Sequence, residues 1–278
     1  MSESASGNPS HEIDLAPGHK LGLTVASPLL LSPLAAGFGD ALPRGLKLAE
    51  VGALVVGPVS ATGRGYSGPA TLVEIDGGVL VQGSGFSRSA RRAVERYGAA
   101  WQRLARPVVV HLVDDTAADL VRSARALGHA PGVAGIEWNL PPSATPALVA
   151  DGVRALVQVC DAPIWVKAPL VNAVPLAERA VQAGAVGVVI GQPVAGAALP
   201  RDRMTGEPTP VRGALHGPAA FALQLDVVRA VAAARLGCAL IACGGVHHAG
   251  HVAQALAAGA CAVQLDTALW RGGSGALA

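Results

Sequence analysis

The chain has 278 residues, a formal net charge of +2 and 51% hydrophobic residues. This length suits one large α/β barrel better than two small domains. The balanced charge does not indicate a nucleic-acid partner, and Pro, Gly or polar residues interrupt every apolar stretch before the ~18 residues that a membrane span needs. Neither a nucleic acid nor a membrane is therefore expected as a partner.

The first 15 residues are expected to form a disordered tail, because the opening MSESASGNPSHE is polar and lacks the apolar core of a signal peptide. The remaining residues, 16–278, are expected to form one domain. No CxxC pair occurs among the four cysteines, Cys160, Cys238, Cys243 and Cys261. Reduced, buried thiols and a cytoplasmic location are therefore expected.

From residue 16 onward, short apolar runs alternate with Ala-rich helical segments. Strands are expected at Pro28–Leu31, Ala53–Val56, Val108–Leu112, Val133–Trp138, Ile164–Lys167, Gly187–Ile190, Ala239–Ala242 and Ala262–Leu265. Helices are expected at Leu46–Glu50, Arg88–Leu104, Ala117–Leu127, Pro146–Val159, Leu176–Ala183, Ala219–Arg235 and Ala249–Ala258.

Continuous apolar strands separated by helices indicate a parallel sheet, either an open doubly wound sheet or a closed (β/α)8 TIM barrel. The phrases AGAVGVVI and AGACAVQL favour the barrel, because in each a helix ends on Gly and the next strand follows within two or three residues. The predicted fold is therefore a single α/β domain of the (β/α)8 type.

Two segments interrupt this rhythm. Between Gly57 and Arg88, two extra strands near Leu72–Ile75 and Gly78–Gln82 predict a small hairpin after the second barrel strand. A loop rich in Gly and Pro, from Gly191 to Gly217, follows the sixth strand. A loop this long in a compact domain is typical of a lid or a binding loop.

Polar residues stand at the expected ends of several strands, where barrels keep their active sites. They are His111, Asn139, Lys167, Gln192, His216 and Asp266. Lys167 is the most informative, because a lysine inside an apolar strand is almost never buried without a partner. Gly244, Gly245 and Thr267 follow the last two strands, where barrels commonly bind phosphate. His247 and His251 are four residues apart, but no metal site is predicted because no fourth ligand is evident.

Six phrases run in order from about Leu21 to Trp270: GLTVASPLLLSPLAAGFGD, GALVVGPVS, GVAGIEWNLPPS, APIWVKAPL, GALHGPAAFALQLDVV and IACGGVHHAGHVAQALAAGACAVQLDTALW. Their order and spacing resemble the class 1 dihydroorotate dehydrogenases, a family of FMN-binding barrels. The resemblance implies FMN over the barrel mouth, a homodimer and, by analogy, an electron-transfer partner. It also implies that the cofactor is held by Asn139, Lys167, Gly217, Gly244, Gly245 and Thr267.

The sequence departs from that family at several positions. The loop that bears the family's catalytic Cys here reads Pro141-Pro142-Ser143. A flavin-contacting Lys is replaced by Gly57, a Ser-Gly pair by Pro33-Leu34, and a substrate-contacting Asn by Gln82 or Val81. Asp266 replaces a Gly beside the phosphate, where a carboxylate costs Coulomb energy. His111 and His216 are gained, and histidine is the commonest general acid or base.

Three hypotheses follow. The first is a divergent FMN-dependent oxidoreductase acting on a small cyclic or unsaturated substrate other than dihydroorotate, with His216, His111 and Lys167 as catalytic residues. The second is a flavin-free lyase, isomerase or cyclase on the same barrel, with Lys167 as acid, base or Schiff-base amine. The third is a catalytically inactive scaffold.

Overall fold

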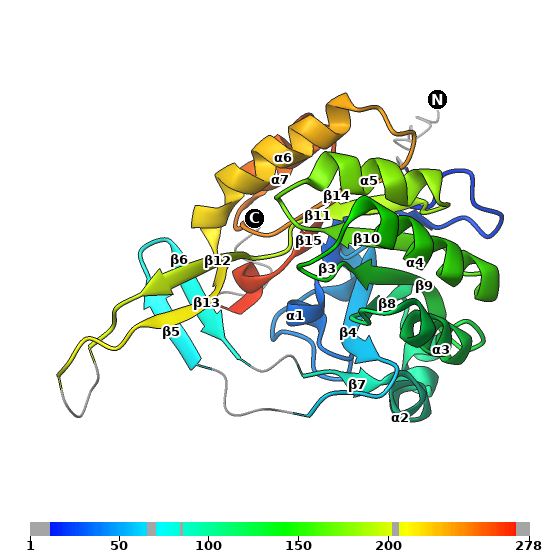
Figure 1. Ribbon diagram of the computed structural model, residues 1–278, viewed down its shortest axis with the longest axis horizontal. Helices are drawn as coiled ribbons and strands as arrows, with labels where there is room; N and C mark the ends of the chain where they lie inside the picture. Colours follow the sequence, from blue (N-terminus) through cyan, green and yellow to red (C-terminus); the bar gives the residue numbers. More distant parts are fainter. Residues whose placement is uncertain (1–11, 66–70, 84–85, 202–205, 271–278) are drawn as a thin grey trace, which may run out of the picture.

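The computed structural model describes residues 12–65, 71–83, 86–201 and 206–270 (Figure 1). Eight parallel strands follow one another in chain order around a closed barrel, and the first strand pairs with both the second and the last. They are β3 (Leu29–Leu31), β4 (Ala53–Ser60), β8 (Val108–Leu112), β9 (Val133–Asn139), β10 (Ile164–Ala168), β11 (Gly187–Ile190), β14 (Ala239–Cys243) and β15 (Ala262–Leu265). The predicted barrel is confirmed, and the open-sheet alternative is wrong because the sheet closes.

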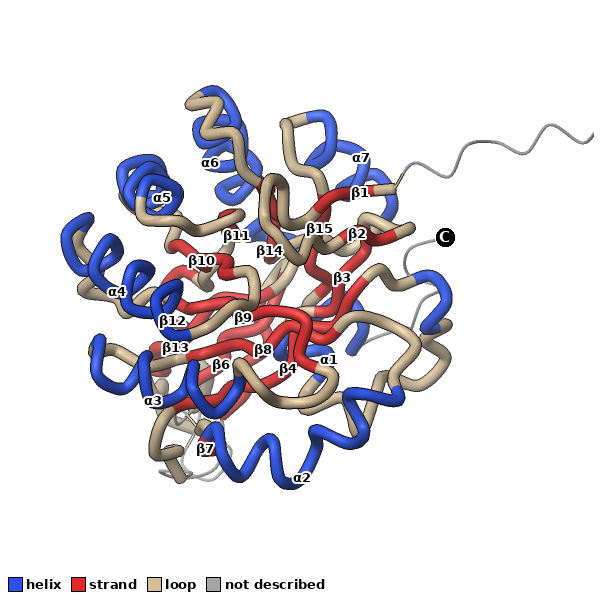
Figure 2. The backbone as a smooth tube through the Cα atoms, turned by 90° about the vertical axis from the view of Figure 1, so that its right-hand side faces the viewer, coloured by secondary structure: helices blue, strands red, loops and turns tan. Residues whose placement is uncertain are grey.

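Helices lie outside the strands, as Figure 2 shows. They are α1 (Pro33–Ala36), α2 (Ala90–Arg103), α3 (Ala117–Leu127), α4 (Pro146–Val159), α5 (Ala173–Gln182), α6 (Phe221–Ala233) and α7 (Ala249–Ala257), with 3-10 turns η1 (Leu48–Glu50), η2 (Pro218–Ala220) and η3 (Thr267–Trp270). Helices α3 and α4 have the predicted bounds, because the hydroxyls of Thr116 and Thr145 accept hydrogen bonds from the first-turn N–H groups of Asp119 and Leu148. Arg88–Ser89, expected to open a helix, instead form β7 beside β4.

Side chains alternate along each barrel strand, so that every second residue points into the barrel. The barrel interior nearer the N-terminal ends of the strands is apolar and contains Leu30, Val55, Val109, Trp165, Val189, Ile241 and Ala262. Two residues further along the strands the buried side chains become polar, and they include His111, Lys167 and Gln264. The change from apolar to polar filling places the chemistry of the barrel at its C-terminal end.

A short hairpin of β1 (Ile13–Asp14) and β2 (Thr24–Val25) packs against the apolar end of the barrel. Leu15 is buried there, and its carbonyl oxygen accepts a hydrogen bond from Trp165 Nε1 at 2.7 Å. The predicted tail of residues 1–15 is therefore wrong over residues 13–15, which are ordered by this packing. Residues 1–11 lie outside the described residues.

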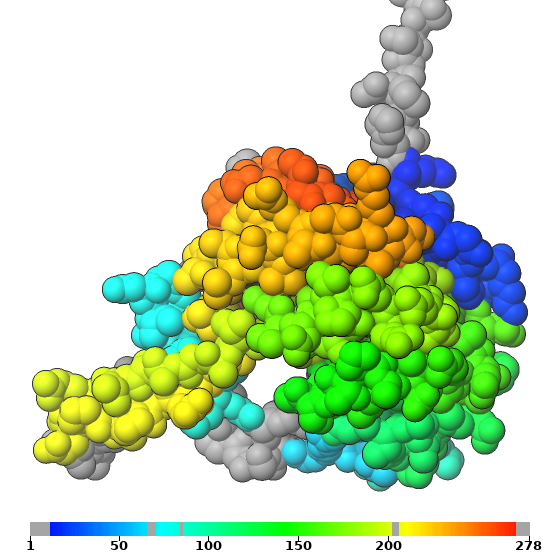
Figure 3. Space-filling view, turned by 45° about the horizontal axis from the view of Figure 1, so that its top comes forward, coloured from blue at the N-terminus to red at the C-terminus, as the bar shows by residue number. Residues whose placement is uncertain are grey.

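A four-stranded antiparallel sheet stands beside the barrel mouth, in the order β12-β13-β6-β5. It combines the predicted hairpin, β5 (Thr71–Ile75) and β6 (Gly78–Gln82), with β12 (Val194–Ala198) and β13 (Val211–His216). In the described residues 191–201 and 206–217, the predicted loop instead contains a hairpin, because β12 pairs with β13, and β13 also pairs with β6. The β12–β13 hairpin projects as an arm in Figure 3.

Over the described residues, no helix has the length and apolar character that crossing a membrane requires.

Candidate active site

A cavity that is partly open to solvent lies at the C-terminal ends of the barrel strands. It is lined by side chains from β8, β9, β10, β13 and the segments after β11, β14 and β15. Among the predicted site residues, those that line it are His111, Asn139, Lys167, His216, Gly244 and Gly245. Gly217 and Thr267 line an adjoining cavity, and His216 lines both. The predicted residues therefore gather in one region.

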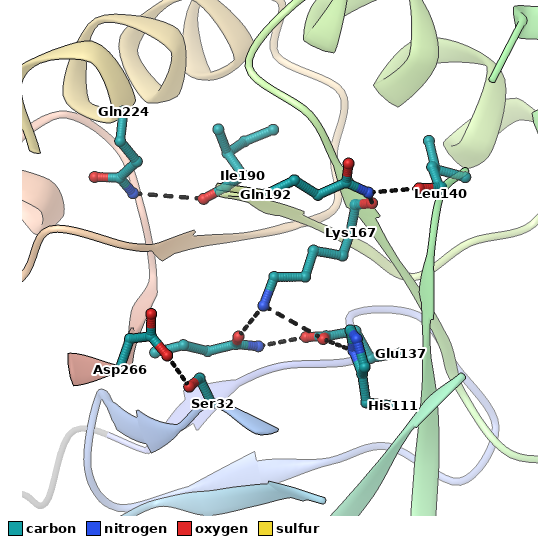
Figure 4. A network of polar contacts seen from close by, with 10 residues as sticks. Ser32, His111, Glu137, Leu140, Lys167, Ile190, Gln192, Gln224 and Asp266 are labelled. Carbon is teal, nitrogen blue, oxygen red and sulfur yellow. Dashed lines mark hydrogen bonds and ion pairs between the residues drawn. The ribbon is translucent and has the colours of Figure 1, made fainter. Parts of the chain in front are cut away.

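Four buried side chains form a continuous hydrogen-bonded chain across the barrel interior (Figure 4). Lys167 Nζ donates to Gln264 Oε1 at 2.8 Å and lies 3.6 Å from Glu137 Oε1. Gln264 Nε2 donates to Glu137 Oε2. His111 Nδ1 lies 2.7 Å from Glu137 Oε1. Lys167 is thus paired, as a buried lysine requires.

Burial opposes the charge of Glu137, which is 1% exposed, but Lys167 and His111 outweigh it and lower the pKa of Glu137 to about 2. Burial also opposes the ammonium of Lys167, yet the neighbouring Cys243 and Glu137 raise the pKa of Lys167 above its ordinary value. Since burial raises the pKa of Cys243 to about 11, its sulfur stays a thiol at neutral pH. Glu137 is therefore the group that balances the lysine charge.

The pKa of His111 is lowered, chiefly because burial disfavours the imidazolium. The hydrogen bond and charge of Glu137 work in the opposite direction without overcoming burial. His111 is therefore neutral at neutral pH, next to an ionised carboxylate.

A second carboxylate and imidazole pair lies on the other side of the cavity. His216 Nδ1 is 2.8 Å from Asp266 Oδ2, and Ser32 Oγ donates to Asp266 Oδ1 at 2.7 Å. Burial opposes the charge of Asp266, but the contact with His216 and the hydrogen bond from Ser32 lower its pKa. Two positions at which the sequence departs from the class 1 pattern, His216 and Asp266, therefore contact each other directly.

Glycines line this cavity and the adjoining one. The backbone N–H groups of Gly217, Gly244 and Gly245 donate to no acceptor within the described ranges. A Cβ at Gly245 would lie 2.5 Å from the backbone N of Phe221, whereas a Cβ at Gly244 would meet nothing nearer than 3.9 Å. Unpaired N–H groups in positive-φ turns form a site for an anion such as a phosphate.

The cavity also contains amide side chains with spare hydrogen-bonding capacity. Gln192 Nε2 donates to the carbonyl oxygens of Leu140 and Lys167, which leaves its own Oε1 free among the described contacts. Gln224 Oε1 is buried and has no partner in the described part of the chain. Asn139, also on the wall, makes no side-chain hydrogen bond to another described residue. These amides are available to a ligand.

Thr267 and two histidines at or just before the start of α7 make contacts of their own. His247 Nε2 lies 3.2 Å from Thr267 Oγ1, and the His251 ring stacks on Phe221. No cluster of three or more His, Cys, Asp or Glu side chains suited to a metal ion occurs in the ranges that the structure describes.

The structure shows what surrounds several positions at which the sequence departs from the class 1 pattern. A Cβ at Gly57 would lie 2.9 Å from the carbonyl oxygen of His111, so the position holds no longer side chain without a shift. Pro142 and Ser143 are exposed and do not line the cavity, whereas Pro33 and Leu34 do. The loop after β9 therefore supplies no base.

Glu137 and Gln264 were missed by reading only the last residue of each strand. The signal that finds them is the two-residue alternation of a strand, because Glu137 precedes Asn139 by two positions and Gln264 precedes Asp266 by two. Strand β8 ends at Leu112, as predicted, so His111 is not its last residue, and β4 runs to Ser60, beyond its predicted end at Val56. Side-chain direction, rather than the strand terminus, therefore selects the residues that face the site.

The chain matches the family model described as dihydroorotate dehydrogenase over residues 19–276. It is 26% identical over 262 residues to the catalytic subunit of dihydroorotate dehydrogenase B (NAD(+)) from Bacillus thuringiensis (strain Al Hakam), covering 89% of this chain and 84% of that protein. The same protein from Geobacillus kaustophilus (strain HTA426) is also 26% identical, with 89% and 82% covered. The crystal structure of a dihydroorotate dehydrogenase from Eimeria tenella in complex with ferulenol superposes with a TM-score of 0.71 at 15% identity, over 99% of this chain and 84% of that one.

Proposed function

Because the chain belongs to the dihydroorotate dehydrogenase family, we propose that it is an FMN-dependent oxidoreductase acting on a small cyclic or unsaturated substrate other than dihydroorotate. The observation that carries this proposal is the cavity itself, in which polar side chains from several barrel strands meet a set of unpaired glycine N–H groups. Such a cavity suits a ligand that has an anionic end and a polar ring.

The unpaired glycine N–H groups suit the phosphate end of FMN. Gly217, Gly244, Gly245 and Thr267 would hold the phosphate, while Asn139 and Lys167 would contact the ring and the ribityl region. The carboxylate of Asp266, which would repel a phosphate if it were free, has its two oxygens bonded to His216 and Ser32. When bound, FMN would accept two electrons and one hydrogen from the substrate as a hydride.

Two features of this chain argue against dihydroorotate as the substrate. The loop Pro141-Pro142-Ser143 supplies no side chain that can take a proton from it. Lys167 is the only lysine or arginine among the described residues that line the cavity, and Glu137 already compensates its charge. A substrate carboxylate, as in dihydroorotate, would therefore find no uncompensated cation, and a neutral ring is the better fit.

His111 and His216 carry the proton that accompanies hydride transfer. Each presents a ring to the cavity, and each is bonded through Nδ1 to a carboxylate. Lys167 acts through its charge, because a buried ammonium with a raised pKa is neither a base nor a nucleophilic amine. This also disfavours a Schiff-base enzyme.

A flavin-free lyase, isomerase or cyclase is the second candidate, and Asp266 is the observation that favours it. A carboxylate close to the glycine N–H groups lowers the affinity for a phosphate dianion. An inactive scaffold is the third candidate, although it leaves the buried polar chain of Lys167 and Glu137 without a use.

The test is the absorbance spectrum of the purified protein between ~300 and ~600 nm, before and after FMN is added and the sample is desalted; retention implies submicromolar affinity. Flavin bands that survive desalting are expected. A colourless protein that retains no FMN overturns the proposal in favour of the flavin-free enzyme.

Gly244→Ala provides a site-directed version of this test. It places a methyl group in the open space beside the unpaired N–H groups and should reduce FMN retention at least tenfold, or about 1.4 kcal/mol. Gly237→Ala is the matched control, because Gly237 also has a positive φ and open space but does not line the cavity. Equal retention by both variants would contradict a phosphate at these glycines.

A homodimer, an electron-transfer partner and a cytoplasmic location remain predictions.

A further inference from the structure

The donor and acceptor types of Lys167 and Gln264 fix the direction of two hydrogen bonds in the buried chain. The ammonium of Lys167 can only donate, so the atom of Gln264 that contacts it must be the oxygen. The other end of that amide is then the NH₂ group, which must donate to Glu137. Glu137 consequently accepts a hydrogen bond from Gln264, and Lys167 fixes the orientation of the Gln264 amide.

The hydrogen bond between His111 and Glu137 also has a definite direction. Glu137 is ionised and has no proton to give, since its pKa is about 2. The His111 nitrogen that contacts it at 2.7 Å must therefore be the donor, which places the ring proton on Nδ1. In the neutral ring, Nε2 then carries a lone pair.

This lone pair is available to a ligand. His111 lines the cavity, and no described residue is bonded to its Nε2. The charged groups that act on His111 are Glu137 and Lys167, and the Glu137 carboxylate contacts both the imidazole and the ammonium.

We propose that Glu137 is a positioning residue, held by Gln264 and Lys167, that fixes His111 as the Nδ1–H tautomer so that Nε2 accepts the substrate proton. The inference deepens the proposed function and depends on it for the identity of the reaction. His111 takes a proton from the substrate; FMN, when bound, would take the hydride, and an external two-electron acceptor would reoxidise it. The imidazolium formed is stabilised by the Glu137 carboxylate next to it.

The Nδ1–H tautomer of His111 also limits which substrates can react. A neutral His111 begins the reaction as an acceptor, so it faces an O–H, N–H or acidic C–H group of the reduced substrate. Because Glu137 already compensates the only lysine or arginine among the described cavity residues, the substrate that fits best is uncharged in its reduced form and bears such a donor next to the carbon that loses hydride.

The test is long-range ¹⁵N–¹H NMR of protein labelled with ¹⁵N-histidine, recorded at neutral pH without flavin. His111 is identified by the loss of its signals in His111→Asn. A protonated Nδ1 and an unprotonated, pyridine-type Nε2 are expected for His111 in the wild-type protein. A proton on Nε2 in the wild-type protein would overturn the inference.

Glu137→Gln tests the positioning role, because a neutral amide can offer Nδ1 either its oxygen or its NH₂ group, so the single fixed tautomer of His111 should be lost. Glu137→Asp, which keeps the charge but withdraws the carboxylate, is the second variant and should abolish the single fixed tautomer. Glu95→Gln is the matched control, since Glu95 pairs with Arg91 on the surface and should leave the His111 signals unchanged. Wild-type His111 signals in either Glu137 variant would refute positioning by Glu137.

These readouts are independent of FMN. A protein that shows the expected tautomer but retains no flavin would refute the proposed oxidoreductase and keep the assignment of His111. A protein that retains flavin but carries the proton on Nε2 would do the reverse.

Discussion

Replacing Lys167 with methionine should destabilise the barrel strongly, because it leaves the Glu137 carboxylate buried without its cation. Glu137 is 1% exposed, and Lys167 is the largest influence that lowers its pKa. Methionine has a similar length and leaves no large cavity, so the effect is mainly electrostatic.

The magnitude follows from the pKa of Glu137, which folding lowers from 4.5 to about 2. A shift of this size corresponds to ~3 kcal/mol of preference for the ionised carboxylate. Removing one partner of a buried ion pair typically costs about 3–5 kcal/mol, since the remaining charge is uncompensated. Lys167→Met should therefore lower the free energy of unfolding by about 3–5 kcal/mol at pH 7.

The pH dependence has a definite sign. A carboxyl group with a lowered folded pKa contributes stability above its unfolded pKa and loses it as the pH falls toward the folded value. Wild-type protein should lose this contribution between pH 4.5 and about 2. Lys167→Met should not, so the difference between the two proteins shrinks in acid.

Urea unfolding followed by the fluorescence of the buried Trp101, Trp138 and Trp165 measures these values. Lys47→Met is the matched control, because Lys47 pairs with Glu50 on the surface at 3.2 Å and should change stability by less than ~0.5 kcal/mol. The double variant Lys167→Met/Glu137→Gln should be more stable than Lys167→Met alone. A cost below ~1 kcal/mol for the single variant, or no recovery in the double variant, would refute the reasoning.

Two further predictions concern the opposite wall of the cavity. Ser32→Ala removes one of the two hydrogen bonds to Asp266 and should cost about 1–2 kcal/mol at pH 7. The cost should shrink as the pH falls below the ordinary Asp value of 3.8 toward the lowered folded pKa, because the contribution of such a carboxyl is lost in acid; a cost that stays constant through an acid titration followed by thermal unfolding would contradict this. Gly245→Ala should lower the melting temperature more than Gly237→Ala, because only its Cβ meets backbone, at 2.5 Å from Phe221 N. Similar melting temperatures would show that the turn adjusts freely.

The sequence was sufficient to predict the barrel because its strands are short, apolar and separated by amphipathic helices. Val108–Leu112 and Gly187–Ile190 match their predicted bounds for this reason. The sheet formed by β12 and β13 was not predictable, because its strands are rich in Gly and Ala and bury only part of their side chains. Its partner strand β6 is also more than 100 residues away in the chain.

The sequence indicated which residues gather at the candidate site, but it did not indicate which of them contact each other. Lys167 could be identified as paired from its apolar surroundings, but its partner Gln264 comes from the opposite side of the barrel. The contact between His216 and Asp266 likewise depends on how β13 approaches the barrel mouth, which no local pattern encodes. Local sequence specifies which residues are polar and buried, whereas pairing between them is a property of the closed fold.

The sheet beside the barrel mouth links two insertions that are remote in the chain, the first with β5 and β6 and the second with β12 and β13. Val79 of the first insertion pairs with His216 of the second, and Gly78 approaches Gly217 so closely that a Cβ on Gly217 would lie 2.5 Å from it. The first hairpin therefore sets the position of an imidazole that it does not itself supply. In evolution the two insertions would have to be inherited together, because loss of the first would release the second from the mouth of an otherwise intact barrel.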